Sequence, residues 1–151
     1  MGMFCFQCQE TAKGTGCTIL GVCGKKEEVA NLEDVLIYTL KGIAQIVVKG
    51  KINVAGLSEI NHQVLNSLFM TITNANFDPD AIENQVTKML AYRDNLRSSI
   101  PAVGLHHAAT FIAPNRQAML ELAPAVGVLS TENEDIRSLR ELIIYGLKGM
   151  A

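Results

Sequence analysis

The sequence predicts an all-α fold in which an N-terminal cysteine-rich loop precedes a series of amphipathic helices. Three observations lead to this prediction. Beyond residue 26, apolar residues recur every three or four positions, which is the spacing of one helix face. No segment alternates apolar and polar residues convincingly, and the apolar residues 126–129 have no second strand to pair with. All four cysteines lie within the first 23 residues, in a stretch rich in glycine and threonine. We therefore treat residues 1–26 as a loop and the rest as helical.

Residues 27–97 are expected to form a three-helix bundle. The first helix extends from about residue 27 to 48 and ends before Gly50, whereas Glu33 and Asp34 lie off its apolar stripe. That stripe consists of Val29, Leu32, Leu36, Leu40, Ile43 and Val47. The second helix covers about residues 57–74. The third begins where Asp78 can accept hydrogen bonds from free N–H groups and Pro79 suits the first helical position.

Residues 98–130 are predicted to be a long connection that contains one short helix. No apolar period is sustained through its first part, which is interrupted by Pro101, Gly104 and Pro114. The short helix is expected at residues 115–123. It should end before Pro124, because a proline in a helix interior lacks the N–H that the helix needs.

The last predicted helix, residues 131–151, repeats the first one. It begins with a capping-box pattern of Thr131 and Glu134. Residues 27–44 align without gaps on residues 134–151, and the coinciding pairs include Tyr38 with Tyr145, Lys41 with Lys148, and Gly42 with Gly149. A glycine inside a helix costs about 0.8–1 kcal/mol relative to alanine, so its presence in both copies predicts close helix packing there. Two further helices follow the first copy and none follows the second. We therefore expect the chain to be the front part of a larger protein.

Composition excludes several kinds of partner. The chain has 151 residues, a formal charge of −2 and no basic run longer than Lys25–Lys26, so nothing indicates nucleic-acid binding. No apolar stretch approaches the roughly 20 residues of a membrane-spanning helix. No basic stretch followed by an apolar export segment precedes Cys5, which predicts a cytoplasmic protein, and disulfides are rare in that compartment.

The cysteines carry the strongest functional signal in the chain. They follow the pattern C-x2-C-x8-C-x5-C, and four thiols gathered at one end of a chain favour a shared metal centre. Zinc modules typically present two C-x2-C pairs, and this chain has one, so the spacing favours an iron–sulfur cluster over zinc. A thiol–disulfide role remains the third alternative. The glycines and threonines of the loop let backbone N–H groups approach cluster sulfurs. The candidate ligands are Cys5, Cys8, Cys17 and Cys23.

Three segments also resemble a known family. They are MFCFQCQETAKGTGCTILGVCGK at residues 3–25, TITNANFD at 71–78 and TENEDIRSLRELIIYGLKGMA at 131–151. They resemble the N-terminal domain of hybrid-cluster proteins, also called prismane proteins or hydroxylamine reductases. The likeness covers nearly the whole chain and is weakest between residues 98 and 124.

The resemblance implies a [4Fe-4S] cluster held by Cys5, Cys8, Cys17 and Cys23, because its cysteine spacing is the compact one. It also implies two three-helix bundles, with residues 131–151 as the first helix of a truncated second bundle. Full-length members reduce hydroxylamine to ammonia and water and are linked to nitric oxide detoxification. That reaction takes place at a hybrid iron–sulfur–oxygen cluster in later domains, which this sequence does not contain.

We therefore expect an electron-transfer domain with no catalytic residue of its own. Its expected partners are a redox electron donor, the missing C-terminal domains and a second copy of the chain that associates through the last helix. The competing functions are a zinc-binding helical interaction domain without redox function and a thiol–disulfide oxidoreductase that uses Cys5 and Cys8. The pair His106–His107 and the helical His62 are expected to be ordinary packed or surface histidines.

Overall fold

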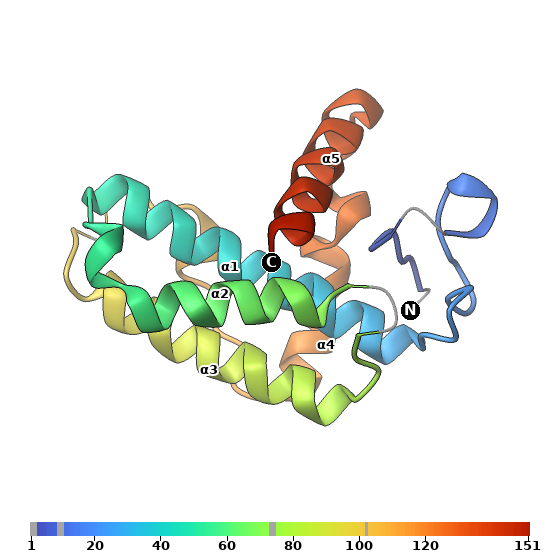
Figure 1. The fold of residues 1–151 in the computed structure, drawn as a ribbon, viewed down its shortest axis with the longest axis horizontal. Helices are drawn as coiled ribbons and strands as arrows, with labels where there is room; N and C mark the ends of the chain where they lie inside the picture. The colour runs from blue at the N-terminus through green and yellow to red at the C-terminus, as the bar shows by residue number, and fades with distance from the viewer. Residues whose placement is uncertain (1–2, 9–10, 73–74, 102) are drawn as a thin grey trace.

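The computed structural model describes residues 3–8, 11–72, 75–101 and 103–151, and within these ranges the chain forms five α-helices and no strand. The predicted all-α class is confirmed. Figure 1 shows α1 (Glu27–Gly50), α2 (Ser58–Met70) and α3 (Pro79–Arg97) lying side by side, with the N-terminal loop at one end. The helix α4 (Arg116–Val126) packs on α1, and α5 (Glu134–Met150) projects away from the other helices.

The central helix α1 begins at the predicted residue and supplies most of the core. Its fully or nearly buried apolar residues include Val29, Leu32, Val35, Leu36, Leu40, Ile43 and Ile46. The helix ends at Gly50, two residues later than predicted, because Lys51 adopts a left-handed conformation with φ 51° and its N–H bonds the Val48 carbonyl at 3.2 Å. This conformation reverses the chain toward η2 (Val54–Gly56) and α2.

Glycine at position 42 allows the closest approach in the core. A Cβ atom there would lie 2.1 Å from the Ala108 carbonyl oxygen, which belongs to η3 (His107–Ala109). The predicted close packing is therefore confirmed at Gly42. It is wrong at Gly149, where a Cβ would have no described atom within 4 Å.

The helices α2 and α3 differ in how well their limits follow from the sequence. The start of α3 is confirmed, since the Asp78 carboxylate accepts from the Asp80 N–H at 2.9 Å and Pro79 occupies the first turn. In contrast, α2 ends at Met70 instead of residue 74. There the Thr71 hydroxyl donates to the Leu68 carbonyl at 2.8 Å, which completes the last turn. Residues 73–74 lie outside the described residues.

The connection between α3 and α5 packs into the core at Ala108, Ala109, Phe111 and Ala113. Arg93 of α3 is 1% exposed, and its guanidinium donates to the Phe111 carbonyl at 2.7 Å and the Ala108 carbonyl at 3.4 Å. The same group lies 4.5 Å from the centre of the Phe111 ring.

The predicted short helix is present as α4, but its predicted end before Pro124 is wrong. A proline in the last turn removes only its own donor, and the Gly127 N–H still bonds the Ala123 carbonyl at 2.8 Å.

The last helix presents an apolar surface to solvent. Its predicted capping box is wrong, because Asn133 accepts from the Ile136 N–H at 3.0 Å, while the Thr131 hydroxyl accepts from Arg140 at 2.7 Å. The exposed apolar residues of α5 are Ile136, Leu139, Leu142, Ile143, Leu147 and Met150. No helix in the described ranges is both long and apolar enough to cross a membrane.

Candidate metal centre

The cysteine loop is organised by one backbone pairing. Cys5 and Cys17 exchange two N–H···O=C hydrogen bonds, both 2.9 Å long, so the first and third cysteines lie opposite each other on antiparallel segments. Both side chains are buried, whereas Cys8 and Cys23 are partly exposed. All four are free thiols.

Glycine geometry shapes the turn between these segments. The turn η1 (Ala12–Gly14) leads into Gly16, whose φ of 137° favours glycine and whose added Cβ would lie 2.5 Å from the Phe4 ring. The Ala12 N–H then points at the Cys17 sulfur, 3.4 Å away. A Cβ on Gly21 would lie 3.1 Å from the Cys23 sulfur. The loop therefore brings its backbone close to two of the candidate sulfur ligands, as expected from the sequence.

The fit of this loop to a metal centre rests on its donor chemistry. Four thiols and a backbone N–H directed at sulfur suit a metal centre bound entirely by thiolates. The buried Thr11 hydroxyl, which has no hydrogen-bond partner in the described part of the chain, is a further donor in the same loop. The structure pairs Cys5 with Cys17 through the backbone. It does not gather three or more Cys, His, Asp or Glu side chains of the described ranges into one ligand set.

Burial suppresses ionisation of the Cys5 thiol in the metal-free chain. Desolvation is the largest effect and raises the pKa of Cys5 to about 11, although a hydrogen bond from the Gln7 backbone and the charge of Lys25 act in the opposite direction. A bound cation would displace this proton, since thiolate is the form that ligates metals.

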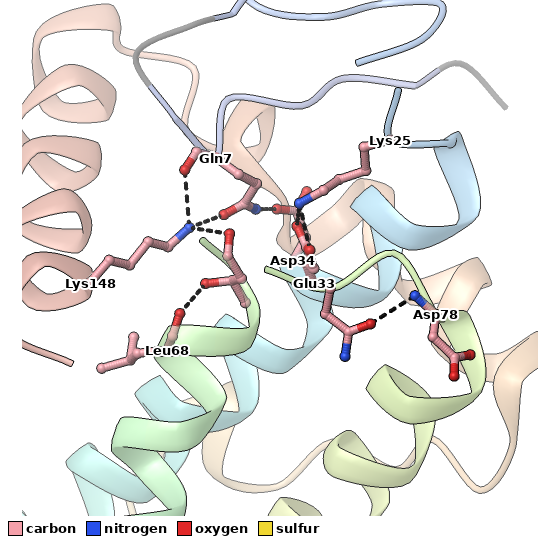
Figure 2. Close-up of polar contacts among 9 residues, drawn as sticks. Gln7, Lys25, Glu33, Asp34, Leu68, Asp78 and Lys148 are labelled. Carbon is pink, nitrogen blue, oxygen red and sulfur yellow. Dashed lines mark hydrogen bonds and ion pairs between the residues drawn. The ribbon is translucent and has the colours of Figure 1, made fainter. Parts of the chain in front are cut away.

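A buried polar network lies directly beneath the loop, and Figure 2 shows its members. Gln7, between the first two cysteines, is its centre. The amide Nε2 of Gln7 donates to the Asp34 carboxylate of α1 at 2.6 Å, and the amide Oε1 accepts from Lys148 of α5. The Lys148 ammonium also contacts the backbone carbonyls of Gln7 at 3.3 Å and Thr71 at 3.5 Å. The network thus joins the loop to α1, α5 and the end of α2.

The charges in this network are shielded from solvent. Lys25 and Glu33 form an ion pair of 2.6 Å whose side chains are 1% and 0% exposed. Burial raises the pKa of Glu33 to about 7, against the opposing effect of Lys25. Burial likewise raises the pKa of Asp34 to about 7, with the charges of Glu33 and Glu141 acting in the same direction. For Lys148, burial lowers the pKa to about 8.

Tyr145 of α5 makes a second contact with the loop. Its hydroxyl donates to the Phe6 carbonyl at 2.7 Å and lies 3.3 Å from the Cys8 carbonyl, and its ring stacks on Phe6 with centroids 5.9 Å apart. Burial is the main reason that its pKa is raised, followed by the charge of Glu141. The C-x-x-C segment is therefore held from the far end of the sequence.

The family model for the Prismane/CO dehydrogenase family matches residues 3–150. The chain belongs to this family. Three curated relatives cover the whole chain, and each is named hydroxylamine reductase: those of Acetivibrio thermocellus, Desulfitobacterium hafniense and Clostridium perfringens, at 64%, 52% and 50% identity. The chain spans 28% of the first relative's length and 29% of each of the other two.

Membership of the prismane family confirms the resemblance of this sequence to hybrid-cluster proteins. It supports an iron–sulfur cofactor in general, in agreement with the thiol donor set of the loop. The histidines lie elsewhere. His106 accepts from the Ala108 N–H at 3.1 Å, His107 bonds the Tyr38 hydroxyl at 3.0 Å, and His62 is exposed on α2.

Sequence reasoning missed the polar network next to the cysteine loop. Glu33 and Asp34 lie off the apolar stripe of α1, yet both are buried because the loop folds over them. The contacts of Lys148 with Gln7 and Thr71 were also missed. The internal repeat singles out Tyr145 and Lys148, but it does not indicate which segment they contact.

Proposed function

We propose that this chain is the iron–sulfur electron-transfer domain of a hydroxylamine reductase, with a [4Fe-4S] cluster held by Cys5, Cys8, Cys17 and Cys23. One observation carries the proposal. The paired backbones of Cys5 and Cys17 present free thiols on a glycine-shaped loop in which an N–H already points at sulfur. The membership of the prismane family and the names of the relatives support it.

When bound, such a cluster accepts and returns single electrons, and four thiolate ligands leave it no open position for substrate. The residues of the chain supply the environment. Met3 and Ala30 pack with Cys5 and Cys17 in a small apolar cluster, which limits the access of water to this side of the loop. The Ala12 N–H contributes a positive dipole toward the Cys17 sulfur.

The reaction itself belongs, in this proposal, to parts of a longer protein. Reduction of hydroxylamine consumes two electrons and two protons, breaks the N–O bond and yields ammonia and water. The chain would receive these electrons one at a time from a cytoplasmic redox donor. The exposed apolar face of α5 is the proposed contact with the remaining domains, and association with a second copy is the alternative.

Metal analysis of protein prepared without oxygen tests the proposal. We expect about four iron and four sulfide per chain, and loss of stable incorporation when Cys17 is replaced by serine. The matched control is Thr18→Ser, an exposed neighbour that should leave incorporation unchanged. Stoichiometric zinc without uptake of iron would support the zinc-binding interaction domain instead. Reduction of hydroxylamine by this chain alone would contradict the assignment of an electron-transfer role.

A further inference from the structure

Two side chains of α5 contact the three successive backbone carbonyls of Phe6, Gln7 and Cys8 in the C-x-x-C segment. Tyr145 donates to the Phe6 carbonyl and lies near that of Cys8, while Lys148 contacts the carbonyl of Gln7. Tyr145 and Lys148 lie 137 to 141 residues further along the chain than the carbonyls that they contact. Such contacts restrict the conformation of the C-x-x-C segment independently of any bound group.

We propose that Tyr145 and Lys148 are positioning residues for the cysteine-bound group: both fix the C-x-x-C carbonyls, and the buried ammonium of Lys148 favours the more negative, reduced state of that group. The inference rests on the proposed function for the identity of the group. Beyond that function, Tyr145 and Lys148 are the residues that would position the bound group and set its reduction potential.

The surroundings of Lys148 explain why its charge acts on the loop. The side chain is 5% exposed, and its three N–H donors meet three neutral oxygens, namely Gln7 Oε1, Gln7 O and Thr71 O. No carboxylate of the described residues forms an ion pair with it. Asp34 is reached only through the Gln7 amide. A buried charge without a direct counter-ion is costly, and negative charge gained by a group bound to Cys8, the residue that follows Gln7 in the chain, would offset that cost.

The direction of the effect follows from electrostatics. Reduction adds one negative charge to the group that the cysteines hold. A fixed positive charge in a poorly solvated region lowers the free energy of the more negative state more than water-screened charges do. Lys148 should therefore raise the reduction potential. Removing its charge should lower that potential, even where the fold is unchanged.

The internal repeat supplies matched controls. Tyr38 and Lys41 are the repeat equivalents of Tyr145 and Lys148, but they serve a different place. The Tyr38 hydroxyl bonds His107, and Lys41 is exposed on α1. Neither has a described hydrogen bond to residues 3–8. Substitution at these positions changes the same kind of group outside the loop contacts.

The first experiment measures the midpoint potential of the full chain reconstituted with iron and sulfide, by a mediated titration followed by electron paramagnetic resonance. Lys148→Met and Lys148→Gln should each lower the equilibrium constant for one-electron reduction about tenfold, which is about 59 mV. Lys148→Arg should retain most of the wild-type potential, because it keeps the charge. Lys41→Met should leave the potential close to that of the wild type. Circular dichroism identifies any variant that does not fold, and the glutamine variant is expected to fold because it retains hydrogen-bonding capacity.

The second experiment uses the metal-free chain and needs no cluster. Backbone hydrogen exchange of residues 3–8 should be faster in Tyr145→Phe than in the wild type, and Tyr38→Phe should leave it unchanged. If the wild type takes up no cluster, the proposed function fails. Unchanged hydrogen exchange in Tyr145→Phe would overturn the positioning role of Tyr145, whether or not a cluster forms. If the cluster forms and both neutral Lys148 variants keep the wild-type potential, the inference is overturned while the proposed function stands.

Discussion

The Lys25 ammonium lies 2.6 Å from both carboxylate oxygens of Glu33, and protein encloses the pair on all sides. Lys25 follows the last cysteine by two residues, and Glu33 lies in the second turn of α1. The pair therefore joins the end of the loop to the central helix. Figure 2 shows it beside the contacts of Gln7.

Removing one member of this pair should destabilise the fold strongly. In Lys25→Met the Glu33 carboxylate stays buried without its counter-ion, so the free energy of unfolding at pH 8 should fall by about 3–5 kcal/mol. Urea denaturation of the metal-free chain measures it. The double variant Lys25→Met/Glu33→Leu should recover most of the loss, because it removes both buried charges. A double variant as unstable as Lys25→Met would show that the loss does not come from the unpaired carboxylate.

The pH dependence of stability should carry the signature of Asp34. The folded pKa of this group is about 7, above its unfolded value of about 3.9, so the folded chain binds more protons between these limits. Its contribution to stability is present below about pH 4 and is lost as the pH rises toward 7. The free energy of unfolding of Asp34→Asn should fall less steeply over this range than that of the wild type.

The control for this titration is Glu132→Gln, which changes an exposed carboxylate. Urea denaturation of the metal-free chain at pH values from about 4 to 8 supplies the comparison. Equal slopes for Asp34→Asn and the wild type would show that Asp34 titrates normally in the folded chain.

The two repeat-related glycines should respond oppositely to alanine. Gly42→Ala would place a Cβ 2.1 Å from the Ala108 carbonyl oxygen, so α1 and η3 must separate. We expect a loss of about 2–3 kcal/mol, which is typical of overpacking a core. Gly149→Ala meets no described atom within 4 Å and should be neutral or stabilising by up to about 1 kcal/mol. Thermal unfolding of both variants checks this, and a loss at Gly149 as large as at Gly42 would contradict the packing.

Features that depend on local sequence could be predicted, whereas contacts between distant segments could not. Apolar periodicity predicted the helices, because each carries an apolar face, which α1 buries and α5 exposes. Asp78 with Pro79 predicted the start of α3, because their effects are local. The repeat predicted a second helix like the first. It could not reveal that Gly42 meets η3 while Gly149 meets no described atom, since the difference lies in neighbours distant in sequence.

The same distinction applies to the candidate site, where the cysteines were predicted and the polar network was not. The four cysteines follow from their spacing, which is a property of the loop alone. The contacts of Gln7, Asp34 and Lys148 join three distant segments, and buried polar residues leave no periodic signal in a single sequence. Arg93 likewise looks like an ordinary surface residue of α3 until the connection folds over it.

Loading with iron and sulfide should order the loop. Lys13 is exposed at φ 56° in η1, where trypsin can reach it, and ligation by the flanking cysteines would restrict the local opening that cleavage requires. We expect cleavage after Lys13 to slow by about tenfold or more on loading. Cleavage after Lys51, an exposed lysine of similar φ at the far end of α1, should keep its rate. Chelation of the iron should restore the original pattern, because the ordering free energy comes from ligation. Equal rates at Lys13 before and after loading would mean that the loop is already held by its own contacts with α5.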